Sequence, residues 1–253
     1  MDLAGRGAVI IGAKRVGFVV ASRMAQEGVN LAIAYRRSRD EAEHLRESVS
    51  PLVDRAITLQ GDVSVEEDVR RIVADAKDRL GDLSFVINMA SSFPHTPFET
   101  LDGRAWDASM ADARGSYLIG VCAGQELAGN PGPTRGHIIF FSDWAAKETP
   151  YRGYLPYLTA KASIDYMTRA FAVELADIGV LVNAIAPGPT MRPPEISEEE
   201  WQAAILKHAP LRRESSVDDT GELVVTLLKS ETITGETIRI DSGRHLAGPG
   251  AAG

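Results

Sequence analysis

Short apolar runs alternate with longer amphipathic stretches along most of the chain. The short runs, rich in Val, Ile, Leu and Ala, are expected to form buried strands at residues 8–11, 30–35, 56–60, 85–89, 137–142, 181–185 and 236–240. The stretches between them have helical periodicity. In residues 65–80, for example, one helical face presents Val65, Val69, Ile72, Val73, Ala76 and Leu80.

This alternation of strands and helices predicts the fold class. We expect a single Rossmann-like, doubly wound α/β domain over residues 1–253, with a parallel seven-stranded sheet and helices on both faces. No internal repeat or domain linker interrupts the pattern. The Pro- and Glu-rich residues 187–200 predict a loop followed by a short helix, and the small residues 248–253 predict a flexible tail.

The amino-acid composition indicates which kinds of binding partner are not expected. The chain has 253 residues, 44% of them hydrophobic, and a net charge of −8 without a dense basic stripe, so nucleic acid is not expected as a partner. No apolar run reaches the roughly 18 residues needed to cross a bilayer, and the N-terminus lacks the apolar stretch of a signal peptide. The single cysteine, Cys122, fits a reducing compartment, so we expect a cytoplasmic protein with no membrane partner and no metal site.

A glycine-bearing turn follows the first expected strand. It contains Gly12, Lys14, Arg15, Val16 and Gly17 and leads into an apolar-periodic helix. Backbone N–H groups of such a turn can approach a pyrophosphate at the positive end of the helix. The turn therefore predicts a dinucleotide site, with two cations placed where phosphate would lie. An ordinary tight turn is the alternative.

The end of the second expected strand distinguishes between dinucleotides. An NAD site usually has Asp or Glu here to accept a hydrogen bond from the ribose. This chain instead has Tyr35, Arg36, Arg37 and Ser38. Guanidinium groups bind phosphate in a bidentate fork, so this turn favours the 2′-phosphate of NADP(H) over NAD(H). A solvated charge pair is the alternative.

Tyr157 and Lys161 are four residues apart and are expected to share one helical face. An ammonium about 4 Å from a phenol stabilises the phenolate by roughly 4 kcal/mol at an effective dielectric near 20. We therefore expect Lys161 to lower the Tyr157 pKa and to make the phenol a proton donor near neutral pH.

Together these motifs resemble the short-chain dehydrogenases/reductases over almost the whole chain. The shared positions include the residue 12–17 turn, Asp62-Val63, Asn88-x-Ala90, Tyr157 with Lys161, and Pro187-Gly188. The resemblance implies a nicotinamide dinucleotide cofactor, Tyr157 as proton donor, and Lys161 bound to the nicotinamide ribose. It also implies a homo-oligomer, a tetramer or a dimer. Residues 189–208 would cover a small-molecule substrate, with Thr190 near the cofactor.

The chain departs from the usual family pattern in several places. Its glycine turn is about one residue shorter than usual, and a basic residue occupies the place of the middle glycine. Asp112 or Ala113 stands where the family has a helix asparagine. The slot of the usual catalytic serine reads Ser142-Asp143. An ionised Asp143 cannot donate a hydrogen bond to a developing alkoxide, so the acid favours reduction of a C=N bond over reduction of a ketone.

The same departures resemble the pteridine reductases, a subgroup with an Asp-Tyr-Lys trio. Arg15, the Arg37-Ser38 pair and the run from Ala90 to Phe93 match that subgroup. The resemblance implies Asp143 and Tyr157 as proton donors, Ser91 in contact with cofactor and substrate, and Phe93 stacked on a pterin-like ring.

Two other functions remain open. A carbonyl reductase acting on 3-oxoacyl thioesters or small ketones would use Ser142, with Asp143 as a turn residue. A dinucleotide-binding regulator without catalysis would explain the altered helix asparagine, although Tyr157 and Lys161 are both present. The sequence does not name the substrate.

Overall fold

The computed structural model describes residues 1–192 and 196–247, with the side chains of 204–206 outside that description. The tail at 248–253, expected to be flexible, lies outside the described residues. The strands are β1 Gly7–Ile11, β2 Asn30–Tyr35, β3 Ala56–Gln60, β4 Phe85–Asn88, β5 Gly136–Phe141, β6 Val180–Pro187 and β7 Thr237–Ile240. The helices are α1 Val16–Gln26, α2 Arg39–Val49, α3 Glu66–Leu80, α4 Gly103–Leu127, α5 Leu155–Glu174, α6 Glu198–His208 and α7 Val217–Lys229.

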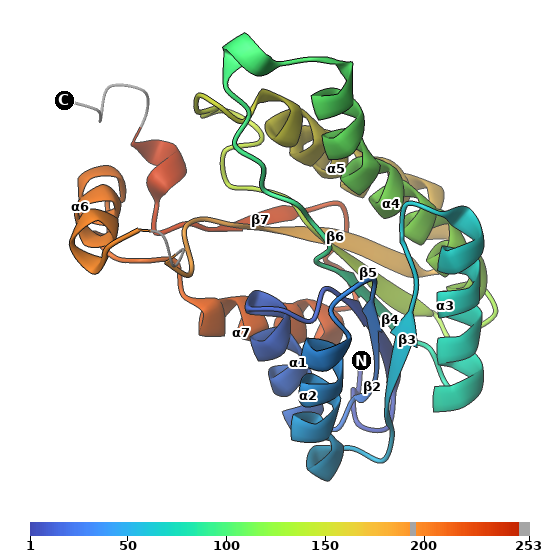
Figure 1. Ribbon diagram of the computed structural model, residues 1–253. Coiled ribbons are helices and arrows are strands. Elements are labelled where there is room, and N and C mark those ends of the chain that lie inside the picture. The colour runs from blue at the N-terminus through green and yellow to red at the C-terminus, as the bar shows by residue number, and fades with distance from the viewer. Residues whose placement is uncertain (193–195, 248–253) are drawn as a thin grey trace.

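The strands form one seven-stranded sheet in the order β3-β2-β1-β4-β5-β6-β7, and every neighbouring pair is parallel. The chain first builds outward from β1 to β3 and then crosses to β4 on the other side of β1 (Figure 1). The expected single Rossmann-like domain is confirmed. Such a reversal of strand order opens a crevice at the carboxyl ends of the strands, where ligands of this fold class bind.

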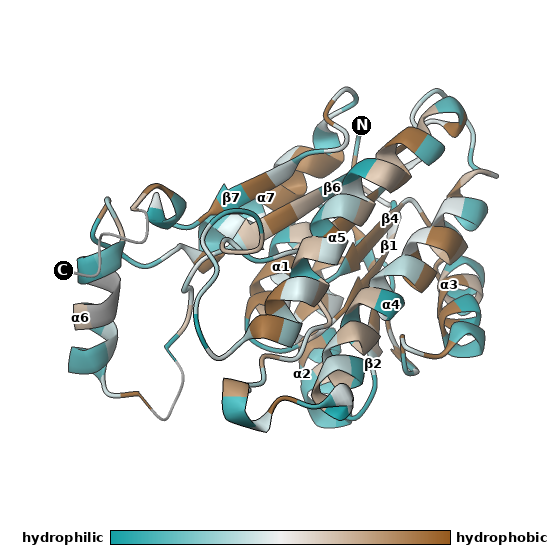
Figure 2. Cartoon of the chain, turned by 90° about the horizontal axis from the view of Figure 1, so that it is seen from above, coloured by the Kyte–Doolittle hydropathy of each residue, from teal (hydrophilic) through white to brown (hydrophobic). Residues whose placement is uncertain are grey.

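Alternating residues of the central strands enter two separate cores. In β1, Val9 and Ile11 pack into the core beneath α3, α4 and α5, whereas Ala8 and Ile10 pack into the core beneath α1, α2 and α7. Figure 2 shows the apolar colouring concentrated along the strands and on helix faces turned toward them. Because both faces of a parallel sheet are covered, its strands are apolar at nearly every position, which explains the continuous apolar runs in the sequence.

Differences from the sequence-based expectation are confined to element ends. Val65 was expected on the apolar face of a helix, but it has an extended backbone (φ −109°, ψ 121°), precedes α3 and is 42% exposed. β5 begins and ends one residue earlier than predicted, so Ser142 leaves the strand. Among the described residues, no helix combines the length and apolar composition needed to cross a bilayer.

The expected short helix is present as α6, which begins at Glu198 and stands beyond the carboxyl end of the sheet (Figure 1). Residues 193–195 of the expected loop lie outside the described residues. Trp201 of α6 is buried, and its indole N–H donates to Glu214. This contact fixes α6 beside the opening of the crevice.

Candidate active site

One large cavity, of about 1140 Å³, opens at the carboxyl ends of the strands. Loops after β1, β2, β4, β5 and β6 line it together with α5 and the turn after β7. Of the expected site residues, the cavity wall contains Gly12, Lys14, Arg15, Val16, Gly17, Tyr35, Arg36, Arg37, Ser38, Asp62, Val63, Ala90, Ser91, Phe93, Asp143, Tyr157, Lys161, Pro187, Gly188 and Thr190. Sequence motifs far apart in the chain thus meet in one place.

The β1–α1 turn has the backbone geometry of a phosphate-binding turn. Gly12 has φ 102°, and a Cβ on Gly17 would lie 1.8 Å from the Gly12 carbonyl oxygen, so both positions require glycine. Arg15 has φ 53°, in the left-handed region that favours glycine. Its Nη2 donates to the carbonyl oxygen of Met191 at 2.6 Å, linking the turn to the segment after β6.

The basic side chains in the turns after β1 and β2 differ in whether a carboxylate pairs with them. Lys14 forms an ion pair with Glu41 at 2.5 Å, and Arg36 forms one with Asp62 at 3.3 Å. Arg37 is exposed and makes no hydrogen bond or ion pair with the residues that the structure describes. It is therefore the guanidinium of this turn that is available to a 2′-phosphate.

Asn88 is the expected cofactor residue that the structure places elsewhere. It is buried at the end of β4 and does not line the cavity. Its Nδ2 donates to the Ser116 hydroxyl at 3.0 Å, and its Oδ1 accepts from the Ala90 N–H at 3.1 Å. Asn88 therefore fixes the loop after β4 against α4.

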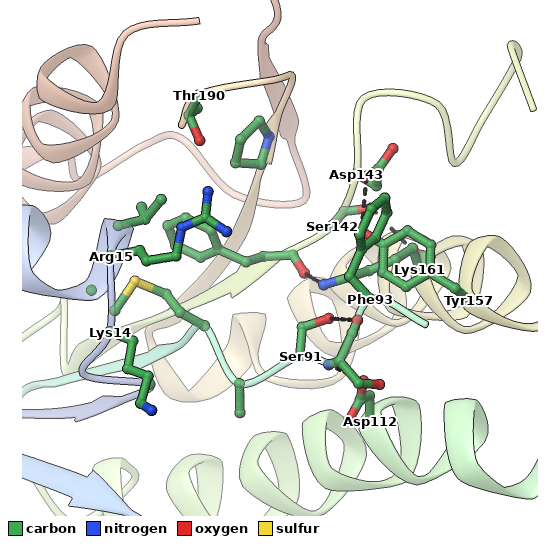
Figure 3. A pocket seen from close by; sticks show the side chains of 18 of the residues that line it. Lys14, Arg15, Ser91, Phe93, Asp112, Ser142, Asp143, Tyr157, Lys161 and Thr190 are labelled. Carbon is green, nitrogen blue, oxygen red and sulfur yellow. Dashed lines mark hydrogen bonds between the residues drawn. The ribbon is translucent and has the colours of Figure 1, made fainter. Parts of the chain in front are cut away.

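The three expected catalytic side chains meet beside α5 (Figure 3). The Tyr157 hydroxyl donates to Oδ2 of Asp143 at 2.8 Å, and Oδ1 of Asp143 accepts from the Ala145 N–H at 2.8 Å. Asp143 thus serves as a turn residue and as a partner of the phenol at once. Lys161 Nζ donates to the carbonyl oxygen of Phe141 at 2.7 Å and lies 5.8 Å from the Tyr157 ring centroid.

Burial shifts the pKa of all three groups. Desolvation raises the pKa of Asp143, which favours its protonated form. It also lowers the pKa of Lys161 to about 8. The Tyr157 pKa is raised, first by burial and then by the neighbouring Asp143. The expectation that the Tyr157 pKa is lowered is therefore wrong here, because burial of the phenol raises it and the neighbouring Asp143 raises it further.

Two positions at which the sequence departs from the usual family pattern are the catalytic-serine position, with Ser142, and the helix-asparagine position, with Asp112. The buried Ser142 hydroxyl donates to the Lys161 carbonyl oxygen at 3.2 Å, so it is engaged with the backbone of α5. Asp112 of α4 accepts from the N–H and the hydroxyl of Ser92, at 2.7 and 2.8 Å. Asp112 therefore fixes the loop that carries Ser91 and Phe93.

Phe93 is 58% exposed at the cavity wall. Its ring stacks on Tyr154, with centroids 4.4 Å apart and an interplanar angle of 20°, and meets the Tyr157 ring edge-on at 4.9 Å. Ser91 lies beside it, and its hydroxyl donates to the Ser92 carbonyl oxygen at 2.9 Å. An exposed aromatic ring next to the Tyr157 phenol suits a flat ligand.

The cavity wall also contains Trp144, Tyr151, Arg244 and His208, the last residue of the segment 189–208 that was expected to cover the substrate. Sequence reasoning did not single out Arg244. Trp144 and Tyr151 stack with centroids 6.0 Å apart. Arg244 lies just after the carboxyl end of the last strand. Ligand sites in parallel sheets form at the carboxyl ends of the strands, so this position was the signal that could have pointed to Arg244.

Known proteins resemble this chain in sequence and in fold. The sequence model of a family described as enoyl-(acyl carrier protein) reductase matches residues 12–245. Glucose 1-dehydrogenase 2 of Bacillus subtilis is 25% identical, over 97% of this chain and 96% of its own length. The 3-oxoacyl-[acyl-carrier-protein] reductase FabG of Staphylococcus epidermidis is 27% identical, over 95% of this chain and 99% of its own. The crystal structure of FolM alternative dihydrofolate reductase 1 from Brucella canis complexed with NADP has a TM-score of 0.88 and 28% identity, over 100% of both chains.

Proposed function

The chain belongs to the short-chain dehydrogenase/reductase family of oxidoreductases, and we propose that it is an NADPH-dependent reductase of a pterin-like or other C=N heterocycle. The hydrogen bond between Tyr157 and Asp143 is the observation that carries this proposal. A carboxyl group whose pKa is raised by burial can deliver a proton to nitrogen. The same group, when ionised, would repel an alkoxide forming beside it.

The cofactor half of the cavity fits NADP(H). The glycine positions at 12 and 17 leave room for the close approach of a pyrophosphate to the turn, and Arg37 and Ser38 stand where a 2′-phosphate would bind. Bound NADPH supplies the hydride for the reduction. Lys161, buried next to Tyr157, would hold a ribose hydroxyl of the bound cofactor.

The proton-donating side consists of this chain's own residues. Tyr157 and Asp143 share one hydrogen bond, so a proton given by either group to a substrate nitrogen can be replaced from the other. Ala145 N–H fixes the second oxygen of Asp143, which orients the carboxyl group toward the phenol. On this proposal, the acid protonates the substrate nitrogen that becomes basic on reduction.

Phe93 and Ser91 form the proposed substrate wall. The Phe93 ring lies edge-on to Tyr157 with centroids 4.9 Å apart, so a flat heterocycle stacked on Phe93 would lie beside the donor hydroxyl. Asp112 holds this loop through Ser92 and thereby fixes the position of the ring.

Reduction of a ketone or a 3-oxoacyl thioester is the second candidate. The relative FabG, a 3-oxoacyl-[acyl-carrier-protein] reductase, favours it. It requires a hydroxyl that donates to a carbonyl oxygen, and the Ser142 hydroxyl is instead engaged with the carbonyl oxygen of Lys161. For this reason we place it second. A regulator without catalysis is the third candidate, and the assembled Tyr157–Asp143–Lys161 group argues against it.

We also propose that the protein is a cytoplasmic homo-oligomer. Three large hydrophobic side chains are exposed on the adjacent helices α4 and α5: Tyr117 on α4, and Tyr166 and Val173 on α5. Exposed apolar side chains on neighbouring helices support association of copies of this chain. Sedimentation velocity of the purified protein tests this point, and a monomer at micromolar concentration would contradict it.

The function itself is tested by NADPH oxidation. The purified protein is assayed with dihydrobiopterin and dihydrofolate, and with a panel of ketones and 3-oxoacyl thioesters. Turnover of a dihydropterin is expected. Failure with every pterin, together with turnover of a ketone, would establish the second candidate instead.

A further inference from the structure

Arg244 lies in the cavity wall with part of its guanidinium group unsatisfied. It begins the short helical turn Arg244–Leu246 that follows β7. Its Nε and Nη1 atoms are buried and have no hydrogen-bond partner in the part of the chain that the structure describes. Buried donors without partners are costly, and a buried charge more so, which makes this arginine unusual among structural ones.

No carboxylate forms an ion pair or a hydrogen bond with Arg244 among the residues that the structure describes, although the charge of Asp241 is close enough to act on it. Asp241 is the closest candidate in the sequence, but its oxygens accept from the N–H groups of Gly243 and His245, at 3.0 and 2.8 Å. The same carboxylate also contacts His245 Nδ1 at 2.7 Å. Burial lowers the pKa of Arg244, as expected for a cation without a paired anion.

The contacts of Arg244 place it on the substrate side of the cavity. Its Cζ lies 5.2 Å from the Trp144 ring centroid, and Trp144 stacks on Tyr151. Tyr151 in turn is close enough to Asp143 to affect the pKa of that carboxyl group. Arg244 is thus connected through two aromatic rings to the proposed proton donor.

We propose that Arg244 binds a carboxylate carried by the substrate and thereby selects acidic substrates over neutral ones of the same shape. This inference rests on the proposed reductase site and narrows its substrate class. One guanidinium supplies one positive charge. The neighbouring His208 adds little at neutral pH, because burial and Arg244 lower its pKa. A monovalent carboxylate matches this charge better than a divalent phosphate.

The test uses pairs of probes that differ only in charge. Dihydropteroate and its primary amide form the pterin pair, and 4-acetylbenzoate and 4-acetylbenzamide form the ketone pair. For each pair, the ratio of kcat/KM for acid over amide is measured with NADPH. Calorimetric titration of the enzyme–NADP⁺ complex with pteroate and its amide gives the same ratio without turnover.

Arg244→Gln, Arg244→Lys and the wild type are compared. Arg152→Gln is the matched control, because Arg152 is exposed beside Tyr151 and does not line the cavity. We expect the wild type to prefer the acid by about ten- to a hundredfold, the range of a charge-assisted hydrogen bond. Arg244→Gln should bring the ratio to about one, Arg244→Lys should keep part of the preference, and Arg152→Gln should keep all of it.

The ratio separates binding from folding, because a merely structural arginine would weaken both members of a pair equally. A wild-type ratio near one, or a ratio that survives in Arg244→Gln, would overturn the inference. If only the ketone pair shows the Arg244-dependent preference and no pterin turns over, the carboxylate site stands and the pterin proposal fails.

Discussion

The hydroxyl of Tyr157 donates a 2.8 Å hydrogen bond to the carboxyl group of Asp143, and the two residues are 14 positions apart in the sequence. Tyr157 is on α5, and Asp143 is in the loop that follows β5. This contact places an acid at the spot where the resemblance to most relatives would place a serine. The chemistry that we propose follows from that difference.

Ser142→Ala should leave reductase activity nearly intact. The Ser142 hydroxyl donates to the Lys161 carbonyl oxygen, so its loss removes a buried hydrogen bond worth about 1 kcal/mol of stability. We expect a small drop in melting temperature and a change in kcat of less than about threefold, far below the effect of losing an acid catalyst. A loss of kcat by two orders of magnitude would show that the serine is the working donor.

The pH profile should show the protonation of Asp143. Because burial raises its pKa, kcat/KM for C=N reduction should fall as pH rises through that pKa, and Asp143→Asn should lack this limb of the profile. Profiles of both proteins between pH 4 and 9 check this. A limb that persists in Asp143→Asn would assign the titration to another group.

The free energy of unfolding should also depend on pH through Asp143. A carboxyl whose pKa is higher in the folded state keeps its proton longer than in the unfolded chain, where the value is about 3.9. Its favourable contribution is therefore present below the unfolded pKa and is lost as pH rises through the folded pKa. The free energy of unfolding of the wild type minus that of Asp143→Asn should be smaller at pH 8 than at pH 4.

Gly17→Ala should disrupt the cofactor turn. The added Cβ would lie 1.8 Å from the Gly12 carbonyl oxygen, so the backbone between these residues must move. We expect NADPH affinity to fall by at least about tenfold, because the turn no longer fits a pyrophosphate. Gly103→Ala is the control, since a Cβ there meets nothing within 4 Å. Fluorescence titration with NADPH measures both, and equal affinities would contradict the assignment.

Local patterns in the sequence were sufficient for the fold and for most of the cavity wall. Continuous apolar runs mark strands covered on both faces, and a spacing of four residues places Tyr157 and Lys161 on one face of α5. These features depend on neighbours within one element. Boundaries moved by a residue where a cap or the end of a strand decided them, as at Val65.

Features that depend on contacts between elements could not be predicted. The sequence left open whether Ser142 or Asp143 faces the phenol, because the path of the chain after β5 decides it. The burial of the Tyr157 phenol and its contact with Asp143 also depend on packing between elements, so the predicted lowering of the Tyr157 pKa was wrong. Arg244 meets Trp144 only because the turn after β7 folds over the loop after β5.

Cofactor preference should depend on Arg37 more than on Arg36. Arg36 is paired with Asp62 at 3.3 Å, whereas Arg37 is exposed and unpaired among the described residues. Arg37→Ala should lower kcat/KM with NADPH by about ten- to a hundredfold and leave the value with NADH nearly unchanged, because only NADPH has the 2′-phosphate. Arg36→Ala should have a smaller effect. Equal losses with both cofactors in Arg37→Ala would contradict this role.

The most direct test of the central claim is Asp143→Ser, assayed for NADPH oxidation with a pterin panel and a ketone panel beside the wild type. We predict that the wild type reduces a dihydropterin and that the variant loses this activity by about 10²- to 10⁴-fold, the range for a general acid. If instead only ketones turn over, and Asp143→Ser is as fast as the wild type or faster, Asp143 is not a proton donor and the protein is a carbonyl reductase.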